Sequence, residues 1–179
     1  MGKPIVITAG HSNNDPGAVN GSFHEAVHVT KVRNALAHIL REAGYTVLTD
    51  GVGDINEPLP AAIKLVKGAD IALELHCNAA ANKTATGVET IALPKHKNLA
   101  QDISAAVAKV YGFKLRGENK LGWIDQSQSH RGKLGYVSAG GMILELGFLS
   151  NDADMKVMQD NYWKAARAIA AVIIKYAGG

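Results

Sequence analysis

Three apolar segments of this chain each end in a side chain that can bind a metal ion or act beside one. They cover residues 5–11, 71–76 and 142–145, and they end in His11, His76 and Glu145. In an open α/β sheet, ligands bind in the crevice beyond the carboxyl ends of the strands, so we expect these side chains to lie near one another. Two imidazoles and a carboxylate are typical of a mononuclear metal hydrolase.

The segment His24-Glu25-Ala26-Val27-His28 offers a competing metal site, because it matches the H-E-x-x-H pattern of zinc peptidases. On a helix that turns by about 100° per residue, Glu25 begins the apolar stripe, whereas the two histidines lie on a more polar face. We therefore expect Glu25 to point toward the sheet, as a candidate third ligand beside His11 and His76. Both histidines of the motif are expected to point to solvent.

The alternation of strand and helix patterns predicts a single α/β domain across residues 1–179. The expected sheet is mostly parallel or mixed, twisted, and flanked by helices on both faces, with the metal site at the strand ends. The expected strands cover residues 4–9, 45–49, 71–76, 88–93 and 142–145. The expected helices cover residues 23–43, 59–67, 98–111 and 152–176, and an irregular stretch covers residues 112–141.

The composition restricts the kind of metal site and the kind of partner. The chain has 179 residues, of which 47% are hydrophobic and 20% charged, which is enough for a sizeable core. Its single cysteine, Cys77, excludes a Cys-rich structural zinc site, so His and carboxylate side chains must hold any metal. Cys77 follows His76 in a strand and is expected to be buried on the opposite face. The net charge is only +3 and the basic residues are not interleaved with aromatic ones, so nucleic acid is not an expected partner.

Neither a signal peptide nor a transmembrane segment is expected. The apolar run near the amino terminus is too short for a signal-peptide core. The longest apolar stretch, residues 165–177, contains Arg167 and Lys175 and is shorter than the ~20 residues that span a bilayer.

Several short motifs follow one another along nearly the whole chain. They are Gly-His-Ser-Asn-Asn-Asp-Pro-Gly-Ala at residues 10–18, Glu25 at the start of a helix, Glu-Leu-His-Cys-Asn at 74–78, Gly-Val-Glu at 87–89 and Leu-Glu-Leu-Gly-Phe-Leu-Ser-Asn-Asp-Ala-Asp at 144–154. In these motifs the chain resembles the zinc-dependent N-acetylmuramoyl-L-alanine amidases of the Amidase_3 type, which include bacterial autolysins and phage endolysins. The corresponding family patterns are Gly-His-Gly-x-x-Asp-x-Gly-Ala, a helix-opening Glu, Ser-x-His-x-Asn and Gly-x-Glu, and the 144–154 segment is the most specific match.

The chain departs from the family pattern at several places. Thr8-Ala9 replaces an Asp-Pro pair, Ser12-Asn13 replaces a pair of glycines, and Asp50 replaces an Arg at the end of a strand. Ser12 and Asn13 make the loop after His11 less permissive than glycine would.

The resemblance implies a role for each candidate residue. It implies that His11, Glu25 and His76 bind one zinc ion, while Glu145 is the catalytic carboxylate that takes a proton from the attacking water and passes it to the leaving amine. The Arg116-Gly117 pair resembles a family Arg-Gly segment, which implies a substrate contact for Arg116. The implied reaction is hydrolysis of the amide bond between N-acetylmuramic acid and L-alanine in peptidoglycan.

Two other functions stay open at this point: a zinc peptidase that uses the motif at residues 24–28, and a non-catalytic domain that binds the cell wall. For the amidase we expect a monomeric, single catalytic domain without a separate wall-binding domain. The lack of a Sec-type signal favours a phage endolysin, made in the bacterial cytoplasm and acting on the periplasmic or extracellular cell wall.

Overall fold

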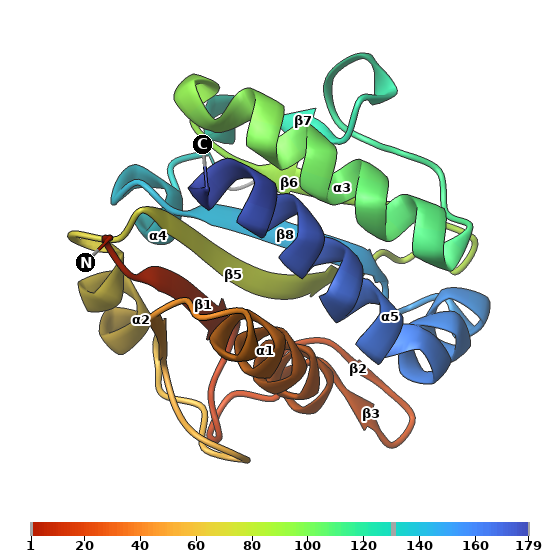
Figure 1. The fold of residues 1–179 in the computed structure, drawn as a ribbon. Helices are drawn as coiled ribbons and strands as arrows, with labels where there is room; N and C mark the ends of the chain where they lie inside the picture. The colour runs from red at the N-terminus through yellow and green to blue at the C-terminus, as the bar shows by residue number, and fades with distance from the viewer. Residues whose placement is uncertain (1, 130–131, 179) are drawn as a thin grey trace.

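A six-stranded mixed sheet forms the centre of the computed structural model, which describes residues 2–129 and 132–178 (Figure 1). Its strands are β1 (Ile5–Ala9), β4 (Val47–Thr49), β5 (Ile71–Asn78), β6 (Glu89–Ile91), β7 (Trp123–Ile124) and β8 (Met142–Phe148), in the order β4-β1-β5-β8-β6-β7. Every neighbouring pair is parallel except β8 with β6. The predicted mixed α/β sheet is confirmed, and β1, β5 and β8 lie side by side and point the same way.

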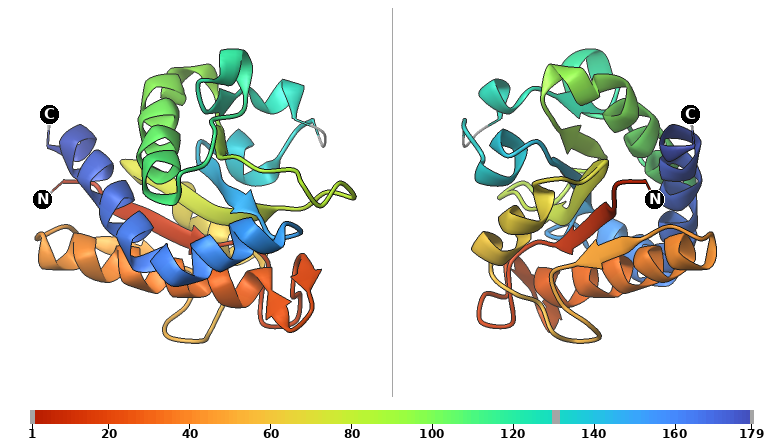
Figure 2. Two further views of the ribbon diagram at one scale, coloured as in Figure 1. Left: turned by 90° about the vertical axis from the view of Figure 1, so that its right-hand side faces the viewer. Right: turned by 60° about the vertical axis from the view of Figure 1, so that its left-hand side comes forward.

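Helices cover both faces of the sheet, as predicted (Figure 2). One face packs against α1 (Glu25–Glu42), α3 (Lys97–Tyr111) and α5 (Asp152–Ala177), and the other against α2 (Leu59–Val66) and α4 (Gly135–Ser138). A small hairpin of β2 (Val19–Asn20) and β3 (Phe23–His24) precedes α1, and short 3-10 turns occur at Pro94–His96, Glu118–Lys120 and Gln126–Gln128. Within the described chain, no helix has the length and apolarity needed to cross a bilayer.

The buried strands read as continuous apolar runs because both of their faces are covered. All five residues of β1 are buried. Ile5 and Ile7 point into the larger core under α1, α3 and α5, whereas Val6 between them points into the smaller core under α2 and α4. The two-residue alternation therefore decides which helical layer each side chain of β1 contacts.

Two of the strands that carry candidate residues are longer than the sequence predicts. Strand β5 continues two residues beyond His76, and β8 continues three residues beyond Glu145 to Phe148. The prediction that Glu145 ends its strand is wrong, because the apolar residues after it stay in the sheet and Phe148 pairs with Asn78 of β5. The stretch expected to be irregular also contains β7 and α4, and its residues 130 and 131 lie outside the described residues.

The two histidines of the segment at residues 24–28 have different surroundings. His24 is exposed, as predicted, but His28 is only 2% exposed, so the prediction that it points to solvent is wrong. The ring of His28 packs against Phe23 of the hairpin, with the two ring centroids 5.4 Å apart. The helical pattern could not show this, because the face of α1 that carries His28 is covered by the hairpin.

The buried His28 should make the stability of the fold depend on pH. Its pKa is lowered to about 4, first by burial and then by the charge of Lys31, whereas an unfolded chain binds this proton near pH 6.5. The stabilisation from the neutral ring is therefore fully present above pH 6.5 and is lost as the pH falls toward 4, by up to about 3 kcal/mol.

Urea unfolding of the metal-free protein tests this effect. Between about pH 7.5 and pH 4.5, wild type should lose roughly 2–3 kcal/mol more of its unfolding free energy than His28→Gln does. His38→Gln, which changes an exposed histidine of the same helix, is the control. Equal pH dependence in wild type and His28→Gln would show that burial of His28 does not govern its protonation.

Candidate metal centre

His11, Glu25 and His76 form a compact cluster at the carboxyl end of the sheet. One ligand atom from each of these residues lies within 4.8 Å of the other two. The Glu25 carboxylate lies between the two rings, with Oε2 at 2.9 Å from Nε2 of His11 and Oε1 at 3.1 Å from Nδ1 of His76. The structure thus brings together the three residues that the sequence nominated as metal ligands.

The backbone fixes the position of the Glu25 carboxylate. This residue is the first of α1, is 3% exposed, and accepts hydrogen bonds from the backbone N–H groups of Ala18 (3.0 Å) and Cys77 (2.8 Å). Burial alone would raise the pKa of Glu25, but hydrogen bonds with His11 and His76 outweigh burial and hold the pKa well below its ordinary value. The carboxylate is therefore ionised at neutral pH, which is the form that a metal ligand requires.

The loop at residues 10–18 leaves room for the imidazole rings of His11 and His76. A side chain at Gly10 would overlap the ring of His76, and a side chain at Gly17 would overlap the ring of His11. Left-handed conformations occur at Gly17, with φ of 66°, and at His11 itself, with φ of 68°. A non-glycine residue in this conformation costs roughly 1 kcal/mol, and such strain is concentrated at functional sites.

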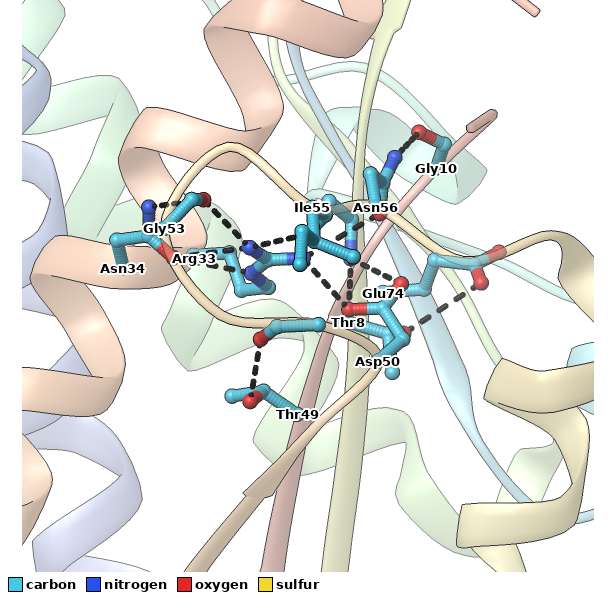
Figure 3. Close-up of polar contacts among 12 residues, drawn as sticks. Thr8, Gly10, Arg33, Asn34, Thr49, Asp50, Gly53, Ile55, Asn56 and Glu74 are labelled. Atoms are coloured by element: carbon cyan, nitrogen blue, oxygen red, sulfur yellow. Dashed lines mark hydrogen bonds and ion pairs between the residues drawn. The ribbon is translucent and has the colours of Figure 1, made fainter. Parts of the chain in front are cut away.

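A buried ion pair supports the strand and loop that carry His11. Arg33 of α1 donates from Nη1 to Asp50 at 3.1 Å, and both side chains are fully buried. Asp50 accepts the backbone N–H of Ala9, and the Asn56 amide donates to the carbonyl of Gly10 (Figure 3). Asp50, which departs from the family pattern, thus forms its ion pair with the buried Arg33 of α1.

Each histidine has a second carboxylate on the side of the ring that faces away from Glu25. Nδ1 of His11 lies 3.0 Å from Asp15, and Nε2 of His76 lies 3.1 Å from Glu74. Burial opposes protonation of both rings, but the hydrogen bonds with Glu25 and with the second carboxylate, together with the attraction of the nearby negative charges, outweigh it and raise the pKa of each histidine. Sequence reasoning assigned no role to Asp15 or Glu74. The signal for Glu74 was its spacing, because residues two apart in a strand share a face.

Glu145 lies beside the cluster, on the neighbouring strand. Its backbone is the register partner of His76 in β5 on one side and of Glu89 in β6 on the other. The residue is partly exposed, but Oε2 is buried and makes no hydrogen bond with any described residue. Burial raises the pKa of Glu145 to about 7, with Glu25 and Glu89 acting in the same direction and His76 against it. A carboxylate with a pKa near neutrality is suited to both accept and donate a proton.

Arg116 lies near Glu145 but is held by another acidic residue. Its Nε is 3.2 Å from Oε1 of Glu89, and its guanidinium group stacks over the ring of Phe148 at 4.9 Å. Glu89 also accepts a hydrogen bond from the amide of Asn78. These contacts hold a partly exposed cation beside Glu89, the register partner of Glu145.

The cluster does not include the histidines of the competing motif. Among residues 2–129 and 132–178, the group of His, Cys, Asp and Glu side chains close enough to hold a metal contains neither His24 nor His28. Glu25 of that motif instead lies in the cluster with His11 and His76. Cys77 is buried, as predicted, and its backbone N–H donates to Glu25 of the cluster.

Comparison with known proteins identifies the family of this chain. The family model for N-acetylmuramoyl-L-alanine amidase matches residues 5–175. The crystal structure of a candidate N-acetylmuramoyl-L-alanine amidase from Neisseria meningitidis is 48% identical, covers 98% of this chain and 96% of its own, and superposes with a TM-score of 0.89. The catalytic domain of the amidase CwlV from Bacillus (Paenibacillus) polymyxa has a similar fold at 23% identity, with a TM-score of 0.84 over 97% of both chains.

A relative from Staphylococcus aureus, "Probable autolysin PH", is 29% identical over 194 residues, which is 96% of this chain. The chain spans 38% of the length of that relative. Because the family model matches almost the entire chain, the chain belongs to the family of N-acetylmuramoyl-L-alanine amidases of the Amidase_3 type.

Proposed function

We propose that this protein hydrolyses the amide bond between N-acetylmuramic acid and L-alanine in peptidoglycan. The observation that carries the proposal is a His11–Glu25–His76 cluster with the free carboxylate oxygen of Glu145 beside it. Membership of the family supplies the substrate class. Since peptidoglycan forms the cell wall, the enzyme acts outside the cytoplasmic membrane.

The donor set of the cluster fits a zinc ion. Two imidazoles and one carboxylate are an established ligand set for catalytic zinc, and a tetrahedral ion held by three side chains keeps one position open. In this proposal His11, Glu25 and His76 hold the ion. A zinc ion bound there supplies a Lewis acid that polarises the scissile carbonyl and makes water more acidic.

Glu145 moves the proton in the proposed reaction. Its carboxylate takes a proton from the water that attacks the carbonyl carbon, and the same carboxyl group then gives this proton to the amine nitrogen of L-alanine as the C–N bond breaks. The products are a free carboxylate on the muramic acid and a free amino terminus on the peptide.

Arg116 and Glu89 complete the proposed site. The peptide stem of peptidoglycan carries carboxylate groups, and a guanidinium group can bind a carboxylate through two hydrogen bonds. Arg116 is 37% exposed at its side chain and retains donors beyond the one that contacts Glu89. We assign Arg116 to substrate binding, oriented by Glu89 and Phe148.

Removal of the metal should abolish activity and its return should restore activity. Treatment with a chelator should reduce the release of soluble fragments from purified peptidoglycan to the background rate, and addition of about one equivalent of zinc should restore it. The sheet and the helices that carry the three ligands pack around a large apolar core, so the treated protein should keep its secondary structure by circular dichroism. Full activity after verified removal of all metal would exclude the proposed site. A protein that does not take up added zinc and releases no fragments in its presence would support a non-catalytic wall-binding domain.

A further inference from the structure

Glu74 is a buried carboxylate outside the three-residue cluster. It lies in β5, two residues before His76, and is 3% exposed. Its Oε1 is 3.1 Å from Nε2 of His76, whereas Nδ1 on the other side of that ring faces Glu25, also at 3.1 Å. The imidazole of His76 is thus held between two carboxylates, one of which belongs to the cluster and one of which does not.

The second oxygen of Glu74 is also engaged. Thr8 of β1, the register partner of Glu74, donates from its hydroxyl to Oε2 at 3.4 Å (Figure 3). The hydroxyl of the buried Tyr136 lies 3.1 Å from the Thr8 hydroxyl, so a chain of three side chains leads from α4 to His76. A buried charge is costly unless it is paired and hydrogen-bonded, and these contacts meet that requirement.

The residue types at positions 8 and 74 depart from the family pattern together. The family motifs have Asp where this chain has Thr8 and Ser where it has Glu74. The two positions are register partners on β1 and β5. The family pattern therefore has its carboxylate on β1, whereas this chain has its carboxylate on β5. On β5 the carboxylate shares a strand face with His76.

We propose that Glu74 is a positioning residue for the metal ligand His76. With a metal bound, Glu74 would accept a hydrogen bond from the Nε2–H group of the ring, which would leave the lone pair on Nδ1 available to the metal. A carboxylate in this position fixes the tautomer and orientation of a ligating histidine and increases its basicity. Loss of such a partner typically reduces metal affinity by about 10–100-fold. The inference rests on the proposed function only in taking His76 as a metal ligand.

The zinc affinity of purified, metal-free variants tests this role without any substrate. In competition with a chromophoric chelator, Glu74→Leu should bind zinc about 10–100-fold more weakly than wild type. Glu74→Gln keeps an oxygen that accepts the hydrogen bond but lacks the charge, so its affinity should lie between those of Glu74→Leu and wild type. Thr8→Val should give a smaller loss, because it removes only the support of the carboxylate.

Two further measurements separate positioning from a general effect on folding. Asp154→Asn changes another buried carboxylate, which contacts Thr86 and the backbone of Phe148, and should keep wild-type zinc affinity. In the zinc-loaded wild type, ¹⁵N chemical shifts should show the proton of His76 on Nε2. These shifts and the affinity of Glu74→Gln remain informative if Glu74→Leu fails to fold.

Wild-type zinc affinity in folded Glu74→Leu or Glu74→Gln, or a proton on Nδ1 of His76 in the zinc-loaded protein, would overturn the proposal. A failure of the proposed function looks different. In that case wild type would bind zinc with the predicted dependence on Glu74 but would not cleave peptidoglycan. If instead wild type cleaves peptidoglycan and the Glu74 variants keep full affinity, only the role of Glu74 is wrong.

Discussion

Glu145→Gln should bind zinc as wild type does and lose about 10²–10⁴-fold of the rate of peptidoglycan hydrolysis. Removal of a general acid or base typically costs this factor. The amide matches the carboxylate in size but cannot take a proton from water at neutral pH. Zinc content should be unchanged because none of the three ligand atoms comes from β8.

Glu42→Gln is a matched control for this variant. Glu42 is exposed and is the last residue of α1, whereas Glu25 is the first. It should keep both zinc and activity. The assay measures release of soluble fragments from purified peptidoglycan, with zinc content determined on the same samples. Full activity of Glu145→Gln would remove Glu145 from the mechanism, whereas loss of zinc would show that Glu145 belongs to the ligand set.

His76→Ala should lose zinc and activity together. The substitution removes one of three metal ligands and also removes the contact that the ring makes with Glu25 and with Glu74. Only two protein ligands remain for the ion. The variant should therefore contain little zinc after dialysis and should hydrolyse peptidoglycan at the background rate. Metal analysis and the same hydrolysis assay check both effects.

His24→Ala is the matched control for the ligand variant, and it also tests the zinc-peptidase alternative. His24 is exposed and lies outside the cluster, so its removal should leave zinc content and activity unchanged. A zinc peptidase that used the motif at residues 24–28 would show the reverse pattern, with His24 required and His76 dispensable. His24 is the better choice for this test because a substitution of the buried His28 would also affect stability.

The sequence was sufficient to predict the mixed sheet, the two helical layers and the cluster of His11, Glu25 and His76. The reason is geometric, since apolar runs mark strands and the side chains that follow neighbouring parallel strands meet at one edge. Glu25 could be predicted to join them because it begins the apolar stripe of α1, which packs on the sheet.

Contacts between distant segments could not be predicted in the same way. The burial of His28 depends on the hairpin that carries Phe23, and the burial of Arg33 depends on the loop that contains Asp50. No periodicity within α1 distinguishes these polar residues from exposed ones. The link from Tyr136 through Thr8 to Glu74 likewise joins residues up to 128 positions apart.

The position of Glu145 shows a different limit. An apolar run that contains one carboxylate does not indicate where the strand ends, because a strand covered on both faces continues as long as its residues can be buried. Glu145 lies within β8, where its register partners are His76 of β5 and Glu89 of β6, so it is next to the site within the sheet rather than at the end of its strand. The sequence therefore predicted that Glu145 belongs near the metal ligands but not how the sheet presents it.

Mass spectrometry of purified peptidoglycan digested by the zinc-loaded protein tests the central claim most directly. The account predicts free stem peptides with a new amino terminus at L-alanine, together with glycan strands whose muramic acid carries a free carboxylate. The same products should be absent from digests with Glu145→Gln. Fragments cut within the peptide or between the sugars, with the muramic acid still linked to L-alanine, would contradict it.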